Sequence, residues 1–117
     1  MPTIRDLVAA IRQREGVEAV VVLGRDGLLI DGQALEGLDV ENVAAHVPSI
    51  ITSAEDFAGS AARGDLVTVV LEHANGLGIV TVLSADTLLL VLVQPSANIG
   101  QLLFELRRNR DRIAALV

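Results

Sequence analysis

The residues of this chain that could take part in chemistry are few, and most stand where a structural role explains them. The two histidines, His46 and His73, fall on different predicted elements and outside any ligand-spaced motif, so neither predicts a metal site. Gly76-Leu77-Gly78 has glycines spaced as in a nucleotide loop, but it leads into a predicted strand and not into a helix N-terminus, which phosphate binding requires. We read it as a hairpin turn and expect no metal and no cofactor.

Nucleophilic and acid–base catalysis lack their usual groups. The sequence has no cysteine, no Gly-x-Ser-x-Gly elbow and no Walker sequence. Carboxylates such as Asp26, Asp39 and Asp86 stand at predicted caps and turns, where their oxygens satisfy local backbone donors. Arg25, at a predicted hairpin tip, has the position of an arginine finger, but we expect a turn arginine in solvent. The sequence therefore predicts no catalytic residue and no enzyme.

Charge and size limit the partners. The 117 residues predict one domain spanning residues 1–117. The net charge of −6 argues against nucleic-acid binding, because phosphate neutralisation needs a concentrated basic surface. One cationic cluster lies toward the end of the last predicted helix and consists of Arg107, Arg108, Arg110 and Arg112. We interpret it as a solvated helix face that complements the helix dipole, with a polyanion site as the alternative.

The apolar residues predict a protein of the cytoplasm that does not insert into membranes. No stretch approaches the roughly 18 uncharged residues of a spanning helix, and the N-terminus lacks the apolar region of a signal peptide. The hydrophobic fraction is 51%, mostly aliphatic, which points to self-association.

The elements that must position these residues begin with a helix and a hairpin. Thr3 and Asp6 form a capping-box pattern that starts a helix over residues 3–15, before Gly16. Residues 17–23 and 28–31 predict two strands around a Gly-Arg-Asp-Gly turn, and residues 32–38 predict a loop.

A long helix follows over residues 39–63, with Asp39 as its cap. Its apolar residues recur at spacings of three and four and draw one stripe. Pro48 lies inside this pattern, and Val47 would be a poor cap for a second helix, so a kinked but continuous helix is favoured over a break.

Three apolar strands over residues 66–72, 78–83 and 88–94 predict an antiparallel meander, and Asn98 with Gln101 predicts the cap of a final helix. Their near-continuous aliphatic runs indicate a sheet covered by helices on both faces. Residues 66–71 are apolar on both faces apart from Thr68, so this strand and the long helix predict more apolar surface than one chain buries.

This order of elements, together with the missing catalytic groups, resembles the Roadblock dynein light-chain family over essentially the whole chain. The pieces that carry the resemblance are AVVVLGRDG at residues 19–27, the long helix ending at Phe57-Ala58, and the strand at residues 88–93. The chain is most similar to stand-alone prokaryotic members of the MglB type.

The resemblance implies an α+β fold with a five-stranded antiparallel sheet in the order 2-1-5-4-3. The first and last helices would cover one face and the long middle helix the other. It also implies a homodimer in which third strands pair and long helices pack side by side. The implied dimer interface consists of Ile50, Ile51, Ala54, Phe57, Ala58, Leu66, Val67, Thr68, Val69, Val70 and Leu71. A proline at Val69 is expected to remove a ladder donor at this shared edge.

The resemblance further implies a small Ras-like GTPase as partner, bound on the two long helices and regulated by repositioning of its own switch residues. The implied contacts are the polar residues Glu41, Asn42, His46, Ser49, Ser53 and Asp56. Two other functions stay open. One is a scaffold without effect on any GTPase, and the other is a ligand-sensing domain with a pocket beneath the long helix, where Gly59 or Gly100 leaves space.

Overall fold

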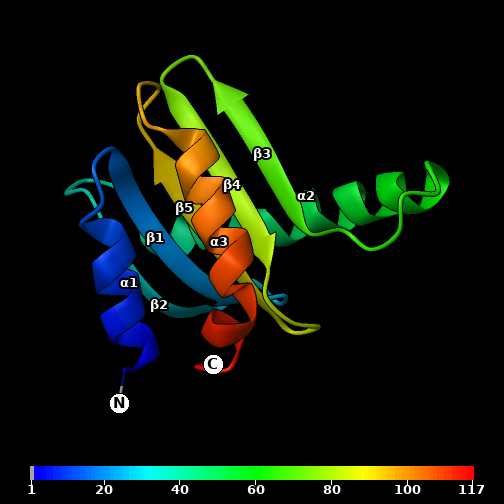
Figure 1. Ribbon diagram of the computed structural model, residues 1–117, viewed down its shortest axis with the longest axis horizontal. Coiled ribbons are helices and arrows are strands. Elements are labelled where there is room, and N and C mark those ends of the chain that lie inside the picture. Colours follow the sequence, from blue (N-terminus) through cyan, green and yellow to red (C-terminus); the bar gives the residue numbers. More distant parts are fainter. Residues whose placement is uncertain (1) are drawn as a thin grey trace.

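The computed structural model describes residues 2–117, in which three helices cover the two faces of one antiparallel sheet (Figure 1). The elements in chain order are α1 (Ile4–Arg12), β1 (Val17–Gly24), β2 (Leu29–Ala34), α2 (Val40–Ser60), β3 (Thr68–His73), β4 (Gly76–Val82), β5 (Thr87–Val93) and α3 (Ile99–Ala114). The sheet has the order β2-β1-β5-β4-β3, with α1 and α3 on one face and α2 on the other. The predicted fold class and strand order are confirmed.

The two central strands, β1 and β5, contribute to a core on each side of the sheet. In β1, Val20 and Val22 point toward α1 and α3, whereas Val21 and Leu23 point toward α2. All four side chains are fully buried. Burial on both faces is the reason that these strands have no polar alternation in sequence.

The first helix is shorter than predicted. Its capping box is present, since the Thr3 N–H donates to Asp6 Oδ2 at 2.9 Å and the Asp6 N–H donates to Thr3 Oγ1 at 3.2 Å. The helix ends at Arg12 and not at residue 15, because the chain must turn before β1 begins at Val17. The Arg12 side chain donates to the Val17 carbonyl at 2.7 Å and holds that turn.

The second strand is longer than predicted, and the loop assigned to residues 32–38 is correspondingly shorter. Gly32 pairs with Val21 and Ala34 pairs with Ala19. Residues 31–33 show no apolar pattern, but β1 offers them a partner along its whole length. Pairing with a neighbour thus outweighs local propensity here.

The β3–β4 hairpin is tighter than the predicted four-residue turn. His73 pairs with Gly76, which leaves Ala74 and Asn75 as the turn, so β4 starts two residues earlier than expected. Gly76 has φ 155°, and a Cβ there would lie 2.6 Å from the Val93 carbonyl oxygen, so only glycine fits. β3 begins at Thr68 instead of residue 66, and the last two strands each end one residue earlier than predicted, at Val82 and Val93.

The long helix runs without interruption through Pro48, so the predicted continuity is confirmed and the alternative of a break is wrong. The Asn42 N–H donates to Asp39 Oδ1 at 3.1 Å, which confirms the predicted cap. The helix ends at Ser60, three residues earlier than expected, and Ala62 then takes φ 56° to turn the chain back toward β3. The cap of α3 is also confirmed, since the Gln101 N–H donates to Asn98 Oδ1 at 3.1 Å.

Candidate functional site

The candidate site is formed by α2 and the neighbouring edge strand β3. The first half of α2 packs on the sheet through Ala44, Val47 and Ile51, which are at most 2% exposed. The C-terminal part of α2 extends past β3 and away from the sheet (Figure 1). Phe57 lies in this part and is 73% exposed. A large aromatic side chain therefore stands on a part of the helix that extends beyond its own sheet.

Within residues 2–117, β3 pairs with β4 alone and leaves its other side open. The Val82 N–H donates to the Val67 carbonyl at 3.0 Å. Because antiparallel ladders alternate, Val69 then also exchanges its bonds with β4, whereas Val70 directs its N–H to the open side. Proline at Val69 would therefore damage the protomer's own sheet, and the expectation that it removes a donor at the outer edge is wrong.

The residues of the implied dimer interface fall into three groups by exposure. Ile51 and Ala58 belong to the protomer's own core, at 1% and 9% exposure. Phe57, Val67 and Val70 are exposed. The remaining members are half-buried at the edge of the core, namely Ile50, Ala54, Leu66, Thr68, Val69 and Leu71.

The six polar residues implied as GTPase contacts are all exposed and all lie on α2. Two of their side chains bond to the helix backbone, since His46 Nδ1 lies 2.8 Å from the Asn42 carbonyl oxygen and Ser49 Oγ donates to the His46 carbonyl at 3.2 Å. The structure therefore brings these residues together on one helix surface that is open to solvent.

A hollow of about 440 Å³ lies between the first half of α2 and the β3–β4 hairpin. Its wall is mainly aliphatic, with Val43 and Ile50 from the helix and Leu71 and Leu92 from the sheet. His46 and His73, which the sequence placed on separate elements, both line it. Gly100 belongs to α3 on the opposite face of the sheet, so it opens no space beneath α2, contrary to the expectation. No local pattern predicts the hollow, because its wall combines residues of five separate elements, α2, β1, β3, β4 and β5.

Arg25 does not stand free in solvent as predicted. Its Nη1 and Nη2 donate to Glu55 Oε1 and Oε2 at 2.8 and 3.0 Å, a bidentate pair that ties the β1–β2 turn to α2. The hydrogen bond to Glu55 raises the pKa of Arg25, and the hydrogen bond from Arg25 lowers the pKa of Glu55. The two residues are 30 positions apart, so no sequence spacing indicates the pair.

Because the folded-state pKa of Glu55 is lowered, the pair contributes stability above the ordinary carboxyl pKa and loses it as the pH falls through the lowered value. We expect Glu55→Gln to lower Tm slightly at neutral pH. The effect is small because both side chains are about one-third exposed, at 33% and 38%. In acid, where Glu55 is protonated, the two proteins should melt together. Asp56→Asn makes the same charge change at the adjacent exposed position, and thermal melts that show an equal loss for both variants would refute a role for the pair.

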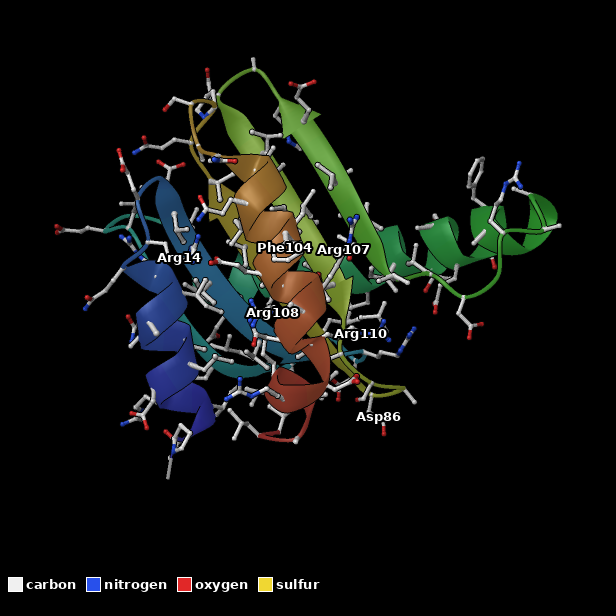
Figure 2. All side chains as sticks on the ribbon, in the orientation of Figure 1. Arg14, Asp86, Phe104, Arg107, Arg108 and Arg110 are labelled. Carbon is white, nitrogen blue, oxygen red and sulfur yellow. The ribbon has the colours of Figure 1, made fainter. Side chains whose placement is uncertain are left out.

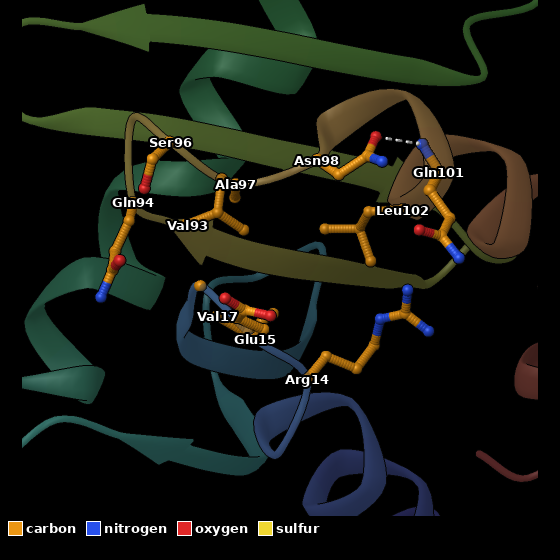
Figure 3. A pocket seen from close by; sticks show the side chains of 11 residues that line it. Arg14, Glu15, Val17, Val93, Gln94, Ser96, Ala97, Asn98, Gln101 and Leu102 are labelled. Carbon is orange, nitrogen blue, oxygen red and sulfur yellow. Dashed lines mark hydrogen bonds between the residues drawn. The ribbon is translucent and has the colours of Figure 1, made fainter.

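A second hollow, of about 270 Å³, lies between the end of α1 and the start of α3 (Figure 3). Two of its polar side chains are engaged within the chain, since Arg14 pairs with Glu105 and Asn98 accepts from the Gln101 N–H. Among residues 2–117 no three His, Asp or Glu side chains gather as metal ligands.

The cationic cluster lies along α3, where Arg107 and Arg108 are exposed and Arg110 is half-buried (Figure 2). The side chain of Phe104, on the same helix, is 62% exposed. None of the helices in residues 2–117 combines the length and apolar character that crossing a membrane requires.

Comparison with known proteins adds a family assignment to this geometry. The family model described as the Roadblock/LC7 domain matches residues 3–93. An uncharacterized protein of Methanocaldococcus jannaschii, MJ0310, is 28% identical over 91% of this chain and 92% of its own length. Two solved structures share the fold. They are the Roadblock/LC7 domain from Streptomyces avermitilis (TM-score 0.84, 22% identity, 96% and 95% of the two chains) and MglB from Myxococcus xanthus (TM-score 0.86, 13% identity, 97% and 93%).

Proposed function

The chain belongs to the Roadblock/LC7 domain family, and from that membership we propose that it acts as a homodimeric, non-enzymatic regulator of a small Ras-like GTPase. The fold is one of regulatory and scaffold proteins, which supports the broad role. The observation that carries the proposal is the continuous exposed surface of α2 beside the open edge of β3.

The homodimer is supported by the open edge itself. An unpaired apolar strand is a template for aggregation, and pairing with a second copy about a twofold axis removes both edges at once. Val70, 43% exposed on β3, and Phe57 on α2 then become interface residues in place of solvent-exposed apolar surface. The part of α2 that extends past β3 would lie over the partner's sheet.

The GTPase would bind on the polar surface that the two α2 helices form together. Arg25 is paired with Glu55, so it is not free to act as an arginine finger while that pair holds. This supports regulation by repositioning the switch segments of the GTPase, with the catalytic groups supplied by the GTPase itself.

The test is to mix the protein with candidate Ras-like GTPases, beginning with any encoded by a neighbouring gene, in the GDP-bound and GTP-bound states. We expect binding in one state and a change in the rate of hydrolysis. Binding without any change in hydrolysis would favour the scaffold alternative, and no binding in either state would contradict the proposal.

Ser53→Arg is expected to weaken GTPase binding without changing the dimer. A long charged side chain in the middle of the exposed α2 surface obstructs contact there, and a tenfold loss of affinity corresponds to about 1.4 kcal/mol. Isothermal titration calorimetry measures the loss. Gln101→Arg makes a charge change at an exposed position on the opposite face of the sheet, and its affinity should equal the wild type's. Equal losses for both variants would show that α2 is not the contact surface.

The hollow beneath α2 favours a second candidate function, the sensing of a small ligand. Its volume of about 440 Å³ lies within the range of known ligand pockets, roughly 300 to 1,000 Å³, and its wall is mainly apolar. A metabolite panel that leaves the thermal midpoint unchanged would count against this function.

A further inference from the structure

Phe57 and the hollow beneath α2 have complementary surfaces within the same chain. The Phe57 side chain is 73% exposed, although burial of an aromatic ring removes a large apolar area from water. The hollow offers an aliphatic wall of Val43, Ile50, Leu71 and Leu92. Both features lie on the face of the sheet that α2 covers. Phe57 does not line the hollow of its own protomer, which is bordered by residues of α2 no later than Ile50.

The spacing along α2 connects the two features. Val43, Ile50 and Phe57 are seven residues apart, so they follow one side of the helix as a stripe. Val43 and Ile50 face the hollow. Phe57 continues the same stripe into the C-terminal part of α2, which extends past β3 (Figure 1). Seven residues correspond to a rise of about 10.5 Å, so Val43 and Phe57 lie at equal distances on either side of Ile50.

In an antiparallel pair of α2 helices, residues at equal distances from the twofold axis face each other. If the twofold axis passes beside Ile50, each residue 50 + n lies opposite residue 50 − n of the other helix, so Phe57 lies opposite Val43. Ile50 is half-buried and borders the hollow together with Leu71 of β3. An axis beside Ile50 therefore also lies close to the open edge of β3, where the proposed strand pairing needs it.

We propose that in the homodimer the Phe57 ring of each protomer fills the hollow between α2 and the β3–β4 hairpin of the other. This pairing rests on the proposed homodimer and specifies its geometry. Two identical contacts form, and Ile50 meets its own copy on the axis. The occupant of the hollow is then a second copy of this chain, and the polar rim of the hollow, with Asn42 and His46, comes to lie beside the partner's helix.

Cross-linking through introduced cysteines tests this geometry, because the natural sequence contains no cysteine. The test variant is Ile50→Cys, which leaves Phe57 in place and puts the cysteine on the proposed axis. The matched control is Ala45→Cys, at an exposed position on another side of α2.

Under mild oxidation, or with a short bismaleimide reagent, we expect Ile50→Cys to form a covalent dimer at least about tenfold faster than the control, because two cysteines that face each other have a high effective concentration. Light scattering of the unmodified protein separates the two possible failures. If the unmodified protein is a dimer but Ile50→Cys reacts no faster than the control, the Phe57 geometry is overturned, because Phe57 lies opposite Val43 only when Ile50 meets its own copy. The homodimer itself would still stand. A monomer overturns the homodimer as well.

Discussion

Val70→Pro is expected to turn the homodimer into a folded monomer. By the alternation of the β3–β4 ladder, the Val70 N–H points to the open side of β3, so proline at this position leaves the bonds to β4 in place. The same substitution removes a donor from the proposed β3–β3 pairing and adds ring bulk at its centre. Analytical ultracentrifugation should report one chain of 12.3 kDa, with a circular dichroism spectrum like that of the wild type.

Two further proline variants make this result specific. Ala34→Pro lies on β2, the opposite edge of the sheet, where the Leu35 N–H donates to the Glu18 carbonyl and the alternation directs the Ala34 N–H outward. This variant should stay dimeric. Val69→Pro should lose folded structure, since it removes a donor to β4. If Val70→Pro remained dimeric, β3 would not be the shared edge.

Phe57→Ala is expected to weaken the homodimer by about a thousandfold in Kd. Truncating a central aromatic side chain at an interface costs about 2 kcal/mol or more, and a twofold dimer loses this contact twice, about 4 kcal/mol in all. Each 1.4 kcal/mol corresponds to about a factor of ten in Kd. The thermal stability of the protomer should hardly change, because the ring is 73% exposed and contributes little to the core of its own chain.

Phe104→Ala is the matched control for this change. Phe104 is the only other phenylalanine of the sequence, is 62% exposed, and lies on α3 at the opposite face of the sheet (Figure 2). Its truncation should leave the dimer dissociation constant unchanged when both variants are measured by sedimentation equilibrium. Equal effects of the two truncations would place the interface elsewhere, and no effect of either would remove Phe57 from it.

The sequence predicted those parts of the fold that depend on local patterns. The caps at Thr3, Asp39 and Asn98 each consist of a side chain and a backbone donor three residues away, so a short stretch of sequence is sufficient to identify them. The two-sided burial of β1 and β5 was visible in their unbroken aliphatic runs. The strand order followed from a family resemblance, since periodicity alone does not say which strands are neighbours.

The errors lie where distant parts of the chain decide the outcome. Gly32 and Ala34 are strand residues because β1 pairs with them, and nothing in their own types indicates it. Arg25 finds Glu55 across 30 positions. The direction of the N–H groups at Val69 and Val70 depends on the register with β4, which a sequence pattern leaves open by one residue.

In the candidate site, too, some features follow from local sequence patterns and others depend on distant parts of the chain. The exposure of the six polar residues of α2 agrees with their position opposite the apolar stripe. The stripe itself, however, has two parts in the structure. Ala44, Val47 and Ile51 pack on the protomer's own sheet, whereas Phe57, in the C-terminal part of α2, is 73% exposed. A helical pattern shows that residues share a face, but the length of the sheet underneath decides which of them it covers.

The mass of the unmodified protein in solution tests the central claim, that this chain acts as a homodimer through β3 and α2. Sedimentation velocity at micromolar concentration should give a single species with twice the chain mass of 12.3 kDa. The Val70→Pro variant should instead sediment as a single chain of 12.3 kDa. A wild-type protein that sediments as one 12.3 kDa chain under these conditions would contradict the account.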